Sequence, residues 1–116
     1  MAIEWRMAVT RIPFGEIEWA QSPTHPLEQK KVMPGRGAAL LSFAPGFGDP
    51  DPCERSHVLC VLEGVLELEL DDRVERIAAG EACWIDRGSR HRARNPSAEA
   101  TVVFIVSDIG DVGVRS

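Results

Sequence analysis

The sequence predicts a single all-β domain, an antiparallel sandwich or barrel, and three observations support this. Short apolar or alternating segments recur at intervals of about 8 to 12 residues, separated by glycine, proline and aspartate. No long segment shows the apolar repeat of an amphipathic helix. The chain has 116 residues, 44% of them hydrophobic, which suits one domain with its own core. We therefore treat residues 1–116 as one domain.

The first clear strand is expected at AALLSF (38–43). Residues 1–37 contain four prolines and are interpreted as an N-terminal strand or extension, with HPLEQKK (25–31) compatible with a short helical turn. After a turn-rich break at PGFGDPDP (45–52), HVLCVLEG (57–64) is a continuous apolar run that ends in glycine. Such a run is typical of a buried strand.

The segment VLELELDDR (65–73) alternates, which places its leucines on one face of a strand and its glutamates on the other. Further strands are expected over 73–80, 81–86, 91–95 and 101–108. The last of these has an uninterrupted apolar character, which indicates burial on both faces. We expect Trp84 and Phe104 to lie in the core.

Charge and hydropathy narrow the class of protein. The net charge of −5 and the lack of a lysine-rich patch argue against a nucleic-acid or anionic-membrane partner. The N-terminus has no apolar signal sequence, and no apolar run approaches the roughly 18 to 20 residues of a spanning helix. We therefore expect a cytoplasmic protein. The arginines between Arg87 and Arg94 indicate either a solvated strand edge or an anionic ligand near the barrel mouth.

The three cysteines argue against a disulfide framework, because their number is odd. Cys53 and Cys60 are seven residues apart, roughly 23 Å in an extended chain and on opposite faces, so they cannot bridge each other. We read all three as free thiols and expect Cys60 and Cys83 to be small core residues.

The stretch DPDPCERSHVLCVLEG (49–64) carries a candidate metal site. Asp51, Cys53 and His57 are separated by even numbers of residues, so they would project from one face of a strand, and His91 would join them from another strand. Carboxylate, thiolate and imidazole are good ligands for divalent transition metals. The predicted ligands are therefore Asp51, Cys53, His57 and His91, with Zn²⁺ favoured and Ni²⁺, Fe or Mn as alternatives.

The ligand set leaves two kinds of metal site open. If all four residues bind, a tetrahedral zinc would be closed and structural, whereas a free Asp51 or Cys53 would leave a position for water activation or substrate polarisation. A third interpretation needs no metal: Asp51 lies between two prolines, as turn aspartates often do, and Cys53 would then be a small buried side chain.

The stretch GEACWIDRGSRHRARN (80–95) resembles the second cupin motif. Gly80, Gly88, His91 and Asn95 are in register with that motif, and Asp86 stands where a proline is usual. Asn95 would serve either the pocket or a turn.

The first cupin motif usually holds two histidines, a glutamate and a glycine. Counting back from Gly64, His57 occupies the glutamate slot, and Asp51 and Cys53 occupy the histidine slots. The segment is similar to the DHCW-motif cupins in its turn, cysteine and histidine, but it has Pro50 and Asp51 in place of their Asp-His pair.

The resemblance covers about residues 38–108 and implies a jelly-roll-like barrel with a pocket at one mouth. It implies no defined reaction, since this fold hosts many activities. We expect a small metal-binding protein and leave open whether it is an enzyme. If it is one, it would be a metal-dependent enzyme, such as an oxygenase or isomerase, acting on a small polar molecule in the barrel mouth; a non-catalytic binding module and a metal-free barrel are the alternatives. No catalytic residue is assigned. The segment IEWRMAV (3–9) and the apolar outer parity of two strands predict a homodimer.

Overall fold

The chain folds almost entirely into β-strands, as predicted. The computed structural model describes residues 8–33, 35 and 37–108. The elements are one 3-10 helix, η1 (Phe14–Glu16), and nine strands, β1 (Ala20–Gln21), β2 (Glu28–Met33), β3 (Ala38–Phe43), β4 (His57–Glu63), β5 (Val65–Leu70), β6 (Val74–Ala78), β7 (Ala82–Ile85), β8 (His91–Arg94) and β9 (Thr101–Ser107). Within these residues, no helix has the length and apolar character needed to cross a bilayer.

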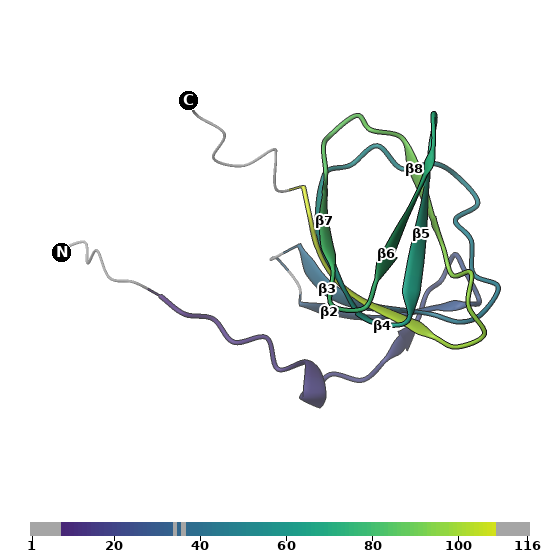
Figure 1. Cartoon of the computed structure of the whole chain (residues 1–116). Helices are drawn as coiled ribbons and strands as arrows, with labels where there is room; N and C mark the ends of the chain where they lie inside the picture. Colours follow the sequence, from purple (N-terminus) through teal and green to yellow (C-terminus); the bar gives the residue numbers. More distant parts are fainter. Residues whose placement is uncertain (1–7, 34, 36, 109–116) are drawn as a thin grey trace, which may run out of the picture.

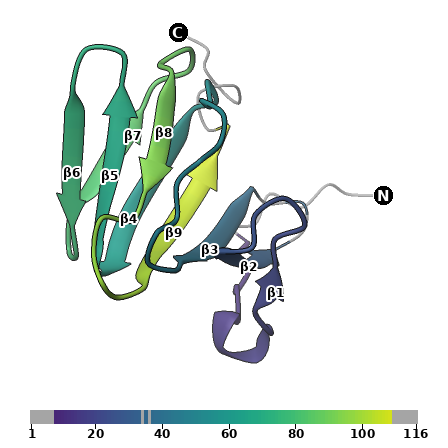
Figure 2. The same ribbon diagram turned by 90° about the vertical axis from the view of Figure 1, so that its right-hand side faces the viewer.

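Two antiparallel sheets face each other (Figures 1 and 2). The six-stranded sheet has the order β1-β2-β3-β9-β4-β7, and the three-stranded sheet has the order β6-β5-β8. The helical turn considered for residues 25–31 is wrong beyond its first residues, because β2 begins at Glu28 and pairs with β3 along its whole length. Pairing with a neighbouring strand overrides the weak helical preference of this segment.

The core lies between the two sheets. Leu66 and Leu68 of β5 are buried inward, as the alternation predicts, and they meet Val61 and Val103 from the six-stranded sheet. Fully burying a side chain of this size contributes about 1.5–3 kcal/mol. Alternate residues of these strands face the space between the sheets, and the side chains of the site described below point into the same space.

Gly64 connects the two sheets at the turn between β4 and β5. Its φ is +80°, and a Cβ atom there would lie 2.8 Å from the carbonyl oxygen of Ala100 and 2.8 Å from Thr101 Oγ1. An L-residue would therefore be strained by the backbone conformation and would also collide with fixed neighbours. The glycine that ends the apolar run is required for the chain to pass between the sheets.

The outer face of the six-stranded sheet is apolar across β3, β9, β4 and β7. Two rows of register partners cross it: Ala38, Val106, Val58 and Trp84, and then Leu40, Phe104, Cys60 and Ala82. Trp84 is 65% exposed, so its expected place in the core is wrong, and Phe104 and Cys60 are half-buried on this outer face. Residues 58–62 and 102–106 are apolar at every position, so these runs give no sign of which parity faces inward.

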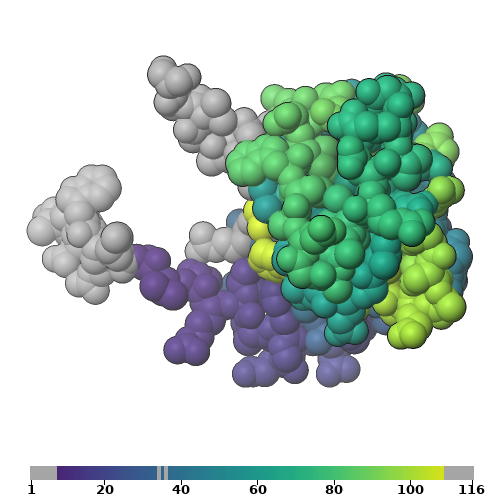
Figure 3. Space-filling model, in the orientation of Figure 1, coloured from purple at the N-terminus to yellow at the C-terminus, as the bar shows by residue number. Residues whose placement is uncertain are grey.

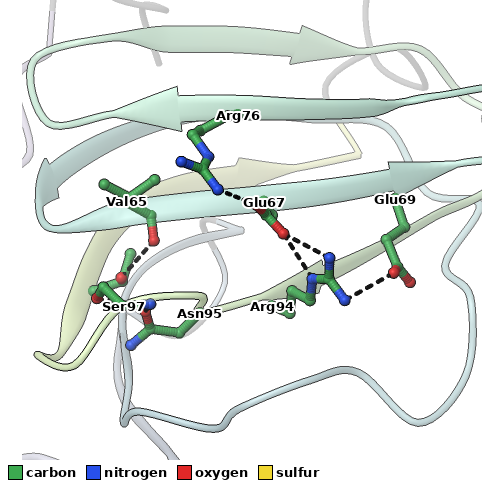
Figure 4. A network of polar contacts seen from close by, with 8 residues as sticks. Val65, Glu67, Glu69, Arg76, Arg94, Asn95 and Ser97 are labelled. Atoms are coloured by element: carbon green, nitrogen blue, oxygen red, sulfur yellow. Dashed lines mark hydrogen bonds and ion pairs between the residues drawn. The ribbon is translucent and has the colours of Figure 1, made fainter.

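The outer face of the three-stranded sheet is charged (Figure 4). Glu67 projects from the central strand and accepts hydrogen bonds from Arg76 on one side and Arg94 on the other, at 2.5 and 2.7 Å. The two arginines lower the pKa of the Glu67 carboxyl. They also cover it, so this outward-facing side chain is only 9% exposed.

The N-terminal segment, residues 8–19, extends along the outside of the barrel and away from it (Figure 3). Phe14 packs edge-on against Phe104, with ring centroids 6.0 Å apart. Lys31 Nζ donates to the Phe14 carbonyl oxygen at 2.8 Å. These contacts attach the segment to one part of the apolar outer face. Most of the segment IEWRMAV (3–9) lies outside the described residues.

Candidate metal centre

Cys53 reaches the site because the segment before β4 runs beside β8. The backbone N–H of Cys53 donates to the His91 carbonyl oxygen at 2.8 Å, and the N–H of His91 donates back to the Cys53 carbonyl oxygen at 3.0 Å. Pro50 and Pro52 have no N–H, so the ladder between this segment and β8 is interrupted. The isolated pair at Cys53 and His91 nevertheless sets both side chains side by side.

His57 completes the cluster from the other sheet. It is the first residue of β4, and its side chain is buried between the sheets. Its Nε2 lies 3.6 Å from Cys53 Sγ, and its ring centroid lies 5.2 Å from that of His91. One donor atom from each of the three residues lies within 4.8 Å of the others. The structure therefore brings together three of the four predicted ligands.

Each histidine has a second partner that orients its ring. His91 Nδ1 donates to the Ser89 carbonyl oxygen at 2.8 Å, and His57 Nδ1 is 3.0 Å from Ser107 Oγ. A partner on Nδ1 leaves Nε2 as the lone-pair atom for a metal. Burial, reinforced by His91 and Arg55, lowers the pKa of His57 to about 4, so this imidazole is neutral at pH 7.

Two aspartates lie at the same cavity as the cluster. Asp51 is exposed and is not one of the three clustered donors, so its role as a ligand stays a prediction. Asp49, which the sequence analysis did not select, also faces the cavity, and its Oδ2 accepts from the N–H of Ala93 at 2.8 Å. Burial raises the pKa of Asp49. Asp49 has the same parity as Asp51 and Cys53, which is the signal that would have identified it.

Asn95 has a turn role. Its Nδ2 donates to the carbonyl oxygens of Phe43 and Glu99, at 2.9 and 2.7 Å, and its Oδ1 accepts from Ser97. The side-chain amide of Asn95 is therefore engaged in hydrogen bonds that stabilise the connection from β8 to β9. Arg94 points away from the barrel interior and binds Glu67, which fits a solvated sheet face and not an anion site.

A cavity of about 270 Å³ adjoins the cluster. Its walls are apolar and come from both sheets: Leu41, Phe43, Leu59, Leu66, Leu68, Ile85, Ala93, Val103 and Ile105. Its polar lining consists of Glu28, Lys30, Asp49, Asp51, Cys53, Arg55, His57 and His91. A small cavity that combines an apolar lining with converging polar groups is a common form of a small-molecule site, and this one is richer than usual in polar groups.

The barrel, the position of His91 and the clustered donors agree with a family model for the cupin domain, which matches residues 39–107. The chain belongs to the cupin family. The narrower resemblance to the DHCW-motif cupins stays a prediction, as does the cytoplasmic location. A search of curated proteins finds no match to this cupin.

Solved structures share the fold at low sequence identity. A sugar phosphate isomerase of the cupin superfamily from Silicibacter pomeroyi is 16% identical, with a TM-score of 0.71, over 85% of this chain and 75% of that one. The polyketide cyclase RemF from Streptomyces resistomycificus is 21% identical, with a TM-score of 0.70, over 86% and 79% of the two chains. A protein described as a predicted oxalate decarboxylase from Thermotoga maritima is 15% identical, with a TM-score of 0.71, over 85% and 98%. At such identity the likeness shows the fold alone.

Proposed function

We propose that this cupin binds a divalent transition metal through Cys53, His57 and His91 and acts with it on a small polar molecule in the adjoining cavity. The observation that carries the proposal is the convergence of three good ligand atoms within 4.8 Å at the wall of that cavity. One thiolate and two imidazoles favour Zn²⁺ over harder ions, with Ni²⁺, Fe and Mn as alternatives. Three protein ligands leave a coordination position open.

A metal bound there would act as a Lewis acid toward a substrate oxygen or a water molecule. The chain supplies the rest of the site. Ser89 and Ser107 orient the two imidazoles, and apolar side chains of both sheets line the space beside them. Asp49 holds one carboxylate oxygen on a backbone N–H and leaves the other for a proton or a hydroxyl of the substrate.

The named relatives do not indicate a single reaction. They are named as an isomerase, a cyclase and a predicted decarboxylase, and two of the names, with sugar phosphate and oxalate, specify small anions rich in oxygen. The proposed substrate class is accordingly a small polar molecule, and the reaction is left open. A non-catalytic module that binds such a molecule is the second candidate, since the usual cupin ligands are replaced in this chain.

The test is the metal content of the full chain purified without chelators or a metal-affinity step. We expect about one equivalent of metal, lost in His57→Ala and in His91→Ala. His25→Ala is the matched control, because His25 contacts Gly48 and Phe47 outside the cluster and its removal should leave the metal content unchanged. A metal-free wild type whose stability does not depend on His57 or His91 would leave only the metal-free barrel.

Enzyme and binding module are then separated by a screen of the metal-loaded chain against small acids, sugars and their phosphates. Product formation that requires His57 and His91 identifies an enzyme. Saturable binding of a compound that is recovered unchanged identifies a binding module.

We also propose that two copies pair through the apolar outer face of the six-stranded sheet. The support is the pair of apolar rows across four strands, which end at Trp84 and Ala82. An apolar sheet face of this extent is unusual on a monomer. Sedimentation should give a particle of about twice the 12.8 kDa chain mass, and a clean monomer would remove the proposal.

A further inference from the structure

Two neighbouring lysines of β2 have opposite surroundings. The Lys31 ammonium faces outward, donates to the Phe14 carbonyl oxygen at 2.8 Å and lies 4.9 Å from the centroid of the Trp19 ring. Lys30 faces the other way and lines the cavity of the candidate metal centre. Among the residues that the structure describes, its side chain has no hydrogen-bond or ion-pair partner. Lys30 is therefore a cation available to a ligand.

The other cation at the cavity is already engaged. Arg55 donates to Asp108 through two nitrogens, Nε to Oδ1 at 3.1 Å and Nη2 to Oδ2 at 2.6 Å. Glu28 shares the inward face of β2 with Lys30 but forms no ion pair with it in the described structure. Lys30 is half-buried as a residue, and its ammonium has no oxygen partner among the residues that the structure describes. An anion in the cavity would supply that partner.

Lys30 and the metal-ligating cluster lie at different walls of this cavity. In the six-stranded sheet, β3 and β9 separate β2 from β4, the strand of His57. At about 4.8 Å per strand, the two backbones are roughly 14 Å apart along the sheet. The cavity volume of about 270 Å³ equals roughly nine water volumes, which is room for one small molecule in a space that both Lys30 and the cluster line.

We propose that the ligand of this site carries an anionic oxygen group, a carboxylate or a phosphate, that binds Lys30, and a second oxygen function that faces Cys53, His57 and His91. The inference rests on the proposed function, because it takes those three residues as a metal centre. An ammonium is a compact charge with three donors, so it suits either anionic group. Glu28, on the same wall, accepts a hydrogen bond from a hydroxyl group of the ligand.

The test is calorimetric titration of the full chain loaded with Zn²⁺. Malate probes the carboxylate class, glycerol 3-phosphate probes the phosphate class, and glycerol is the uncharged comparison. We expect at least one anion to bind and glycerol not to bind, and the anion that binds gives the class. Lys30→Gln should weaken anion binding by roughly tenfold or more, as the loss of a charge-assisted hydrogen bond predicts, and Lys30→Arg should retain most of it.

Lys31→Gln is the matched control and should bind anions like the wild type, because Lys31 faces outward. Equal anion affinity in wild type and Lys30→Gln overturns the inference, and so does a failure of both anions to bind the wild type. Metal content measured on the same samples separates the two proposals. If the metal is bound but the anion affinity does not depend on Lys30, only this inference is wrong and the proposed metal site stands. If the wild type holds no metal, the proposed function is lost, and anion binding that still depends on Lys30 retains the anion site.

Discussion

The outer faces of the two sheets differ in chemistry although both come from strands of the same barrel. On the three-stranded sheet, Glu67 lies between Arg76 and Arg94, and Arg94 also contacts Glu69 at 3.1 Å (Figure 4). On the six-stranded sheet, the corresponding outward positions are apolar and end in Trp84. The three-stranded sheet presents cross-strand ion pairs to water, and the six-stranded sheet presents apolar side chains of the kind that are normally buried.

This difference indicates that the charged face of the three-stranded sheet is suited to contact with water and the apolar face of the six-stranded sheet is not. Cross-strand ion pairs satisfy each other and tolerate solvent, whereas a continuous apolar face lowers its free energy when another surface covers it. The N-terminal segment covers the part near Phe104 through Phe14. The part near Trp84 is left for the second copy that we propose.

The largest effect is expected from a charge on the apolar face. Trp84→Glu should weaken the proposed dimer by roughly 30-fold or more, because a buried tryptophan at an interface typically carries about 2 kcal/mol or more. Sedimentation over a range of protein concentrations measures this dissociation. The folding of the monomer should change little, because Trp84 is largely exposed in the single chain.

Val74→Glu is the control on the other face. Val74 is 52% exposed on β6 and is the register partner of Glu69, so it lies on the charged face. We expect this variant to keep the oligomeric state of the wild type. If Trp84→Glu and Val74→Glu behave alike, the two faces do not differ in the way that we infer.

An intermediate effect is expected at the connection between the sheets. Asn95→Ala removes donors to Phe43 and Glu99 and an acceptor for Ser97 in a buried position. We expect the free energy of unfolding to fall by about 2–3 kcal/mol, since buried backbone groups lose their partners. Urea unfolding measures the loss. The oligomeric state should persist, because neither outer face changes.

Ser97→Ala is the comparison for that variant, because it removes a hydroxyl that bonds the same turn, from a less buried position. It should cost about 1 kcal/mol or less. An unfolding curve of Asn95→Ala that coincides with the wild type would mean that the turn does not depend on the amide.

The smallest effect is expected at the charged face, and it depends on pH. Arg76 and Arg94 lower the folded-state pKa of Glu67 below its ordinary value of 4.5, so its ionised form stabilises the fold above that value. The contribution is lost as the pH falls through the folded pKa. Glu67→Gln should lower the Tm by about 3 °C at pH 7, and the difference should shrink toward pH 3.

Thermal unfolding of Glu67→Gln and wild type at a series of pH values measures this difference. Glu69→Gln should give a smaller shift, because within the described residues Glu69 pairs with Arg94 alone and is more exposed than Glu67. A Tm difference for Glu67→Gln that is constant from pH 7 to pH 3 would contradict the role assigned to the carboxylate.

The sequence predicted the strands that have a polar face more accurately than those without one. Leucine and glutamate alternate in β5, so its inward and outward sides could be assigned, and the structure confirms them. The runs 58–62 in β4 and 102–106 in β9 are apolar at every position, and the outward-facing Cys60 and Phe104 were therefore predicted to be core residues. The inward and outward residues of β4 and β9 differ only because the three-stranded sheet covers one side of these strands.

The candidate site was predictable where it follows strand spacing and a motif. Cys53, His57 and His91 were selected from spacing, and the structure brings them together. Asp49 and Lys30 were not selected. The position of Asp49 depends on how a proline-interrupted segment pairs with β8, and that of Lys30 depends on the direction in which β2 docks on β3. Both positions depend on tertiary structure, which cannot be inferred from the spacing of residues in the sequence.

The mutual backbone pairing of Cys53 and His91 has a consequence for the barrel as a whole. These two side chains move with the three-stranded side of the barrel, whereas His57 belongs to the six-stranded sheet. An ion bound by all three would fasten the two layers together, as a disulfide fastens two segments of chain. Binding of a metal should therefore make the two sheets harder to separate. Slower amide hydrogen exchange in β4 and β8 would then report the occupancy of the proposed metal site before any reaction is known.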